Sequence, residues 1–341
     1  MKNLTLLIPI LLITTISRAQ SKPDRQQIAS IGDLKVTGGT IVNCQIGYRT
    51  YGKLNEDKTN GVLILTWFGG ISKNLAGPDT WRAIDTTSYF VMIVDALGDG
   101  ISSSPSNSVK QHGTKFPAFS VVNMIESQHR LLKQKFGISH VHAITGISMG
   151  GIQTFQWAVS YPDFADLLIP IVGTPQFTSY DMMRGALYRK IIENDPEYNH
   201  GNYKVNPKIT MVNMLWELLL TTPAEKVRSK PRDQFPKWLA DTEAQQHGDW
   251  NDTYYQSAAL EGFDIAKDYN GSLKETAAHV KAKMLIIASA QDHIVNPAPA
   301  IEFAKLTGAK LVVIDSDAGH LAGNFGNAEA RKAMVEILTG N

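Results

Sequence analysis

Short, continuous apolar runs recur along this chain, and most of them end in glycine, aspartate or serine. The runs cover residues 62–66, 89–94, 141–144, 167–172, 283–290 and 310–315. A short apolar run bounded by turn residues is typical of a strand that is buried on both faces of a sheet. We therefore expect these runs to form the central strands of the fold.

Apolar residues at helical spacing follow several of these runs. They define helices over 120–136, 153–160 and 301–306, and a last one from about residue 328. Strands that alternate with helices predict an α/β fold, in which a mainly parallel central sheet carries helices on both faces. Ligands of such sheets bind at the carboxyl ends of the strands.

Residues 32–51 follow a third pattern, in which apolar and polar residues alternate. Gly38 and Gly39 separate the two halves of this stretch. Alternation that is interrupted by glycine predicts a β-hairpin.

The strand pattern is absent between residues 175 and 278. Helical runs at 182–193 and 211–220 alternate there with polar stretches. We expect a helical lid over 175–278, inserted into an α/β core made of residues 20–174 and 279–341. Its aromatic residues are expected to pack within the lid more often than they contact substrate; they include Trp216, Trp238, Trp250, Tyr254 and Tyr255.

Residues 1–19 have the pattern of a cleaved signal peptide. Lys2 precedes an apolar run from Leu4 to Ile16, and Ser17 and Ala19 place small residues before a cleavage site. The run is short for a membrane span, so we expect no stable membrane insertion. The mature protein is then periplasmic or secreted; a buried N-terminal helix is the alternative.

Composition narrows the class of protein. The chain of 341 residues is 43% hydrophobic and 19% charged, with a net charge of +1, so nucleic acid is not an expected partner. The single cysteine, Cys44, excludes an intramolecular disulfide and is expected in the core. Neither a metal-binding cluster nor a glycine-rich nucleotide motif is present in the sequence, so we expect no metal and no cofactor.

The run at 141–144 leads into Gly146-Ile147-Ser148-Met149-Gly150, and a predicted helix follows. Gly-x-Ser-x-Gly between a strand and a helix is typical of a nucleophile elbow, which exposes the serine hydroxyl on a tight turn. An ordinary glycine turn is the alternative, but the flanking strand and helix favour the elbow.

A serine nucleophile needs a histidine that accepts its proton and a carboxylate that orients the imidazole. In the elbow architecture these follow in the order serine, acid, histidine, on loops after strands. Asp292 follows the run at 283–290, and His320 follows the last run. His293, Asp315 and Asp317 are the nearest alternatives.

An oxyanion hole needs two backbone N–H donors. We expect one from Met149, directly after the nucleophile, and one from Phe68, in the loop after the run at 62–66.

The chain resembles the homoserine O-acetyltransferase-like family of the α/β-hydrolase superfamily. The resemblance is carried by residues 48–55, 62–66, 83–86 and 146–151, and continues through Gln153, Trp157 and Tyr161-Pro162. It implies that Ser148 is the acylated nucleophile with Asp292 and His320 as partners. It also implies a helical lid over the active site and a homodimer formed through the lid.

The acceptor of the acyl group is a separate question. Transferases of this family use an arginine near the pocket to hold the carboxylate of the amino acid, and no arginine lies between residues 209 and 222, where we expect it. Acetyl-coenzyme A is also a cytosolic donor that an exported enzyme does not meet. We therefore expect a secreted serine esterase; the alternatives are an acyltransferase that uses acetyl-CoA and a catalytically silent fold.

Overall fold

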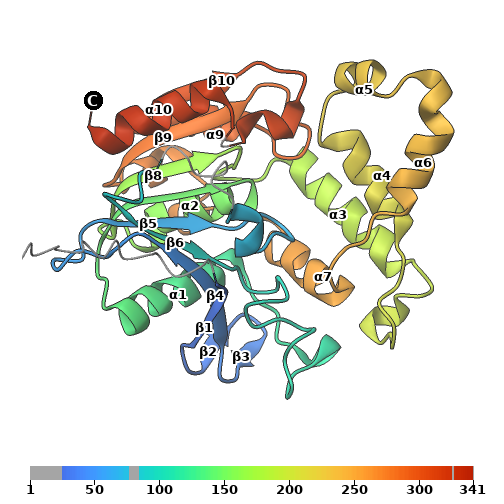
Figure 1. The fold of residues 1–341 in the computed structure, drawn as a ribbon, viewed down its shortest axis with the longest axis horizontal. Coiled ribbons are helices and arrows are strands. Elements are labelled where there is room, and N and C mark those ends of the chain that lie inside the picture. The colour runs from blue at the N-terminus through green and yellow to red at the C-terminus, as the bar shows by residue number, and fades with distance from the viewer. Residues whose placement is uncertain (1–24, 77–83, 325, 341) are drawn as a thin grey trace, which may run out of the picture.

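The computed structural model describes residues 25–76, 84–324 and 326–340. Its centre is an eight-stranded sheet with the order β1-β4-β6-β5-β7-β8-β9-β10 (Figure 1). The strands are β1 (Gln27–Ser30), β4 (Gln45–Tyr51), β6 (Phe90–Val94), β5 (Gly61–Leu65), β7 (Val141–Ile147), β8 (Ala165–Ile171), β9 (Lys283–Ser289) and β10 (Lys310–Ile314). In this order, all neighbouring strands from β6 through β5 to β10 are parallel to each other. The α/β-hydrolase fold and the mainly parallel sheet that the sequence predicts are thus confirmed.

The stretch 32–51 forms a hairpin only in its first half. Strands β2 (Leu34–Val36) and β3 (Gly39–Ile41) pair with each other in a separate sheet. Strand β4 instead pairs antiparallel with both β1 and β6. Ile46 and Tyr48 are buried in this position, so the second half of the predicted hairpin belongs to the core sheet.

Each face of the sheet packs against its own set of helices. On β5, Leu63 and Leu65 belong to the cluster that includes side chains of α1 (Val121–Leu131), α2 (Met149–Ser160) and α9 (Ala298–Thr307). Val62 and Ile64 belong to the opposite cluster, with side chains of α10 (Ala328–Thr339). Full burial of one such side chain stabilises the fold by roughly 1.5–3 kcal/mol. The apolar runs are therefore continuous because both faces of the sheet are covered.

Helix α1 is shorter than the predicted helix over 120–136. Ser120 and Asn123 form a capping box at its start, and a π-helical turn, Leu132–Phe136, follows its last residue. The turn ends at Gly137, whose φ of 63° suits glycine.

The segment between β8 and β9 is helical. It contains α3 (Ser179–Glu193), α4 (Thr210–Leu219), α5 (Pro223–Ser229), α6 (Phe235–Glu243), α7 (Trp250–Ala259) and α8 (Leu273–Ala277). Figure 1 shows α3 to α7 gathered on one side of the sheet. Six buried side chains form an apolar cluster of their own there: Tyr188, Ile192, Tyr198, Ile209, Val212 and Trp250. In the described part of the chain, no helix is both long and apolar enough to cross a membrane.

Helix α7 is attached to the loops of the core by two buried side chains. The Asp252 carboxylate accepts hydrogen bonds from the backbone N–H and the hydroxyl of Ser106, at 2.8 and 2.5 Å. The Gln256 amide accepts from the Gly69 N–H at 2.9 Å and donates to the Leu97 carbonyl at 3.0 Å. The helical segment is thereby joined to the loops that follow β5 and β6.

Asp252 should make the stability of the protein depend on pH. Burial raises its pKa to about 7, so the folded state holds the proton more tightly than the unfolded chain, where aspartate titrates near about 4. The free energy of unfolding should therefore fall as pH rises from about 4 to 7, with a slope of at most roughly 1.4 kcal/mol per pH unit from this group. Asp252→Asn should reduce this slope in urea unfolding curves.

Asp57→Asn is the matched control, because Asp57 is exposed. The raised pKa values of Asp95 and Asp99, which are due to burial, leave part of the dependence in place. Equal slopes in the wild type and in Asp252→Asn would show that Asp252 is ionised at low pH in the folded state.

Candidate active site

Ser148 occupies the turn between β7 and α2 with a strained backbone. Its φ of 58° and ψ of −118° lie outside the regions that L-residues ordinarily adopt. Two close approaches demand glycine beside it. A Cβ on Gly146 would lie 2.5 Å from the Gly150 carbonyl carbon, and a Cβ on Gly150 would lie 2.4 Å from the Leu65 oxygen. The Gly-x-Ser-x-Gly pattern thus has a steric cause in this structure.

His320 connects the other two residues of the predicted triad. It lies in a short helical turn, Gly319–Gly323, after β10. Its Nδ1 is 2.6 Å from the Asp292 Oδ2, and its Nε2 is 2.9 Å from the Ser148 Oγ. A proton on Nδ1 leaves Nε2 free to accept the serine proton. The structure therefore brings together the three residues that the sequence selected.

The side chain of Asp292 is buried, and both of its carboxylate oxygens have hydrogen-bond partners. Its side chain is 1% exposed and that of His320 is 7% exposed. While Oδ2 faces the imidazole, Oδ1 accepts hydrogen bonds from the N–H groups of Ile294 and Val295, at 2.7 and 2.9 Å. These donors stabilise the ionised carboxylate and hold its orientation toward His320.

The alternative residues have other partners. Asp315 accepts a hydrogen bond from Gln291 at 2.8 Å, and Asp317 forms an ion pair with Arg228. The His293 carbonyl accepts a hydrogen bond from the Tyr180 hydroxyl. Among the described residues, Asp292 is the carboxylate in contact with the His320 ring.

The two expected oxyanion donors belong to residues that line one cavity with Ser148. Met149 begins α2 and is buried, and Phe68 lies in the loop after β5. Two glutamines hold that loop. Gln153 donates to the Thr66 carbonyl at 3.1 Å, and Gln256 accepts from the Gly69 N–H. The sequence pattern did not single out Gln256, because its partners lie far away along the chain.

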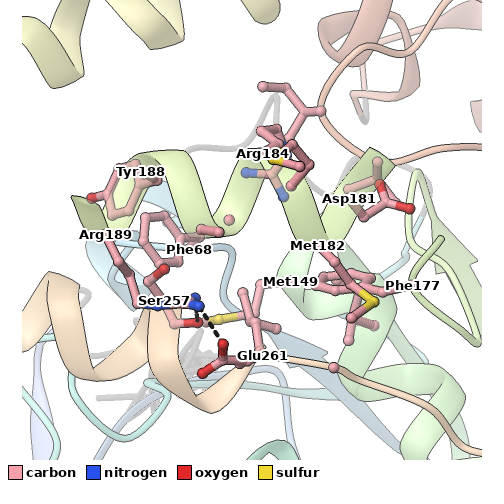
Figure 2. A pocket seen from close by; sticks show the side chains of 18 of the residues that line it. Phe68, Met149, Phe177, Asp181, Met182, Arg184, Tyr188, Arg189, Ser257 and Glu261 are labelled. Atoms are coloured by element: carbon pink, nitrogen blue, oxygen red, sulfur yellow. Dashed lines mark hydrogen bonds and ion pairs between the residues drawn. The ribbon is translucent and has the colours of Figure 1, made fainter. Parts of the chain in front are cut away.

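Two cavities meet at Ser148, and both are also lined by Phe68, Tyr188 and Trp216. The first, here the methionine lobe, has a volume of about 390 Å³ and is shown in Figure 2. Its wall includes Met149, Ile152, Phe177, Met182, Met183 and Leu260. The second, here the aspartate lobe, has a volume of about 500 Å³. Its wall includes Trp67, Asp99, Asp249, Asp252, Thr253 and His320.

Trp216 departs from the expectation for the aromatic residues of the helical segment, because it lines both lobes. Trp250, by contrast, is 2% exposed and packs within the segment. Trp238 donates a hydrogen bond to Glu217, also within the segment.

Arginines line the methionine lobe, although the sequence offered none between residues 209 and 222. They are Arg184 and Arg189, and both lie on α3 (Figure 2). Arg189 forms an ion pair with Glu261 at 2.6 Å. Arg184 lies 5.9 Å from the centre of the Trp216 ring. Burial lowers the pKa of Arg184, while Asp181 and Asp292 act in the opposite direction.

The segment 209–222 does lack arginine, and the arginines that line the pocket lie on another helix, α3. Helical spacing places Asp181, Arg184 and Tyr188 on one side of α3. That spacing is visible in the sequence, but it does not say which side of the helix faces Ser148.

Comparisons with known proteins agree with this fold. A family model described as alpha/beta hydrolase fold matches residues 62–325. A probable esterase from Corynebacterium glutamicum is 29% identical over 313 residues, which cover 86% of this chain and 89% of that protein. A homoserine O-acetyltransferase from Methanocorpusculum labreanum is 30% identical over 347 residues, which cover 89% of this chain and 70% of that longer protein.

A solved structure of a homoserine O-acetyltransferase has the same fold as this chain. Homoserine O-acetyltransferase from Bacillus anthracis superposes with a TM-score of 0.84 at 25% identity, covering 93% of this chain and 98% of that chain. The matches extend over the sheet and the helical segment alike. The chain therefore belongs to the alpha/beta hydrolase fold family, and it is an enzyme of the homoserine O-acetyltransferase-like group in which esterases also occur.

Proposed function

We propose that this enzyme is an exported serine esterase, which hydrolyses carboxylic esters through an acyl-Ser148 intermediate. The observation that carries the proposal is the position of His320. Its ring lies within hydrogen-bond distance of both the Ser148 hydroxyl and the Asp292 carboxylate, where two cavities meet.

The first half of the reaction forms the acyl-enzyme. The Ser148 Oγ forms a bond with the ester carbonyl carbon, and its proton passes to the His320 Nε2. The imidazolium is stabilised by the Asp292 carboxylate. The carbon–oxygen bond to the alcohol then breaks, and Nε2 gives the proton to the leaving oxygen.

The second half regenerates the serine. Water attacks the acyl carbon and loses a proton to the His320 Nε2, which returns that proton to the Ser148 oxygen as the carboxylic acid leaves. In both halves negative charge develops on the carbonyl oxygen. The Met149 and Phe68 N–H groups are the proposed donors to it, and loss of one such donor costs about 10²–10³ in rate.

Water is the proposed acceptor because of the N-terminal pattern. Residues 1–19, with the predicted signal peptide, lie outside the described residues. Export to the periplasm or the medium separates the enzyme from acetyl-coenzyme A. The proposed activity is then hydrolysis, although the acyl-enzyme chemistry would serve a transferase equally well.

The second candidate is an acyltransferase that uses acetyl-CoA. The aspartate lobe favours it, because a cavity of about 500 Å³ beside His320 has room for an acceptor much larger than water. The names of several relatives also favour it.

Removal of the nucleophile should abolish esterase activity. Ser148→Ala should lower kcat/KM for a simple ester at least about a thousandfold, because the acyl-enzyme can no longer form. A fluorophosphonate probe should label the wild type and not this variant. Ser88→Ala is the matched control, because it removes an exposed serine hydroxyl that donates a hydrogen bond to Asp85. Undiminished hydrolysis by Ser148→Ala would refute the nucleophile, and a wild type without labelling would favour a silent fold.

Hydrolysis and transfer can be separated with two acyl donors, an activated acetyl ester and acetyl-CoA. With an activated acetyl ester, acetate release should proceed at the same rate with and without homoserine, because water is the acceptor. The products are measured by chromatography. Rapid, saturable formation of O-acetylhomoserine from acetyl-CoA would instead establish the transferase.

Export predicts a processed N-terminus. Expressed in a Gram-negative bacterium, the full-length chain should be recovered from the periplasm or medium, and N-terminal sequencing should begin at Gln20 because the predicted cleavage follows Ala19. A variant that lacks residues 2–19 should stay in the cytosol. Cytosolic protein that retains Met1 to Ala19 would remove the reason for preferring water.

A further inference from the structure

The described wall of the methionine lobe contains one cation, Arg184, that forms neither an ion pair nor a hydrogen bond there. Of the charged residues in its wall, Arg189 and Glu261 pair with each other at 2.6 Å. Both oxygens of Asp181 are taken by neutral donors, since Oδ2 accepts from the N–H and hydroxyl of Thr178 and Oδ1 accepts from the Asn296 N–H. Asp181 keeps its charge and acts on Arg184 through space, and Arg184 is the charged residue of this described wall for which neither an ion pair nor a hydrogen bond is found.

Arg184 is half-buried, and its described surroundings offer its guanidinium few polar partners. Its Nε is buried and has no hydrogen-bond partner among the described residues. The same part of the chain contains no ion pair with Arg184, and its described ring contact is with Trp216. A buried donor or charge that lacks a partner costs free energy. An anionic group on a bound ligand would provide the missing partner.

The position of His320 tells which half of an ester reaches Arg184. Because His320 must give its proton to the leaving oxygen, the alcohol half has to lie on the side of the histidine. His320 lines the aspartate lobe, while the described wall of the methionine lobe does not include it. The alcohol therefore belongs to the aspartate lobe, and the acyl chain extends into the methionine lobe.

Charge supports the same assignment. Asp99, Asp249 and Asp252 line the aspartate lobe, and its described wall includes neither lysine nor arginine. An anionic alcohol group would therefore have no permanently charged partner in the described wall of this lobe. An anionic acyl chain instead meets the guanidinium of Arg184, which lies on the α3 wall of the pocket in Figure 2.

We infer that the methionine lobe is the acyl site and that Arg184 selects acyl chains ending in a carboxylate, so that monoesters of dicarboxylic acids are preferred substrates. This inference rests on the proposed esterase function. The lobe is large enough, because about 390 Å³ exceeds by several times the roughly 30 Å³ that one water occupies in the liquid. Its apolar wall suits the methylene groups between the two carboxyl carbons.

Four esters test the inference. Monoethyl glutarate carries the anion in the acyl part, and ethyl pentanoate is its neutral counterpart. The acetate ester of 4-hydroxybutanoate carries the anion in the alcohol part, with butyl acetate as its neutral counterpart. A charge-assisted contact predicts that the wild type prefers monoethyl glutarate over ethyl pentanoate by about tenfold or more in kcat/KM. No such preference is expected in the second pair.

Variants at Arg184 should change the acyl preference. Arg184→Gln should lower kcat/KM for monoethyl glutarate at least about tenfold more than kcat/KM for ethyl pentanoate, whereas Arg184→Lys should keep part of the preference because the charge remains. Lys190→Gln is the matched control, since it removes an exposed cation from the same helix. Equal losses on all four esters would indicate a structural role and overturn the inference. Losses confined to the alcohol-side anion would overturn the assignment of the lobes.

A binding measurement separates this inference from the proposed function. In the Ser148→Ala background, calorimetry should detect monoethyl glutarate and should show at least tenfold weaker binding after Arg184→Gln. If the wild type hydrolyses neutral esters but shows no acyl-side preference and no such binding, the inference fails and the esterase stands. If binding depends on Arg184 but no ester is hydrolysed, the esterase fails and the anion site stands.

Discussion

The fold depends on one crowded crossing, where β7 turns into α2 at Ser148. Ser148 has a positive φ that an L-residue adopts only under constraint. The neighbouring backbones approach so closely that no room is left for a Cβ at Gly146 or Gly150. The crowding extends to the chain just after β8, since a Cβ on Gly173 would lie 2.5 Å from the Gly151 carbonyl carbon. Such a backbone persists only when buried neighbours hold it from all sides.

The helices and strands around this crossing provide that support through a buried polar network. The Gln153 side-chain oxygen accepts a hydrogen bond from the Gln128 amide nitrogen at 2.6 Å. The Gln128 oxygen in turn accepts one from the Trp157 ring N–H at 3.0 Å. Because Gln153 also donates to the Thr66 carbonyl, α1 and α2 are connected to the end of β5. The serine and the loop of the proposed oxyanion donor are therefore held by the same set of side chains.

Local patterns predicted the sheet well and selected three site residues that the structure brings together, because both depend on short stretches of chain. Apolar runs locate the strands, and the loops that follow parallel strands meet at one edge, so Ser148, Asp292 and His320 could be chosen by position. The pairing of β1 with β4 has no such local signal. Nor do the contacts of Arg184 and Gln256, because they depend on how helices pack around the site.

Through Gln256, the helical segment also fixes two loops of the core. It is buried, it comes late in the chain, and it binds the loops after β5 and β6 at the same time. The segment is thus not an interchangeable module: a relative's helices grafted between β8 and β9 would have to bring an equivalent amide at this position. Diversification of the segment is thereby limited at α7.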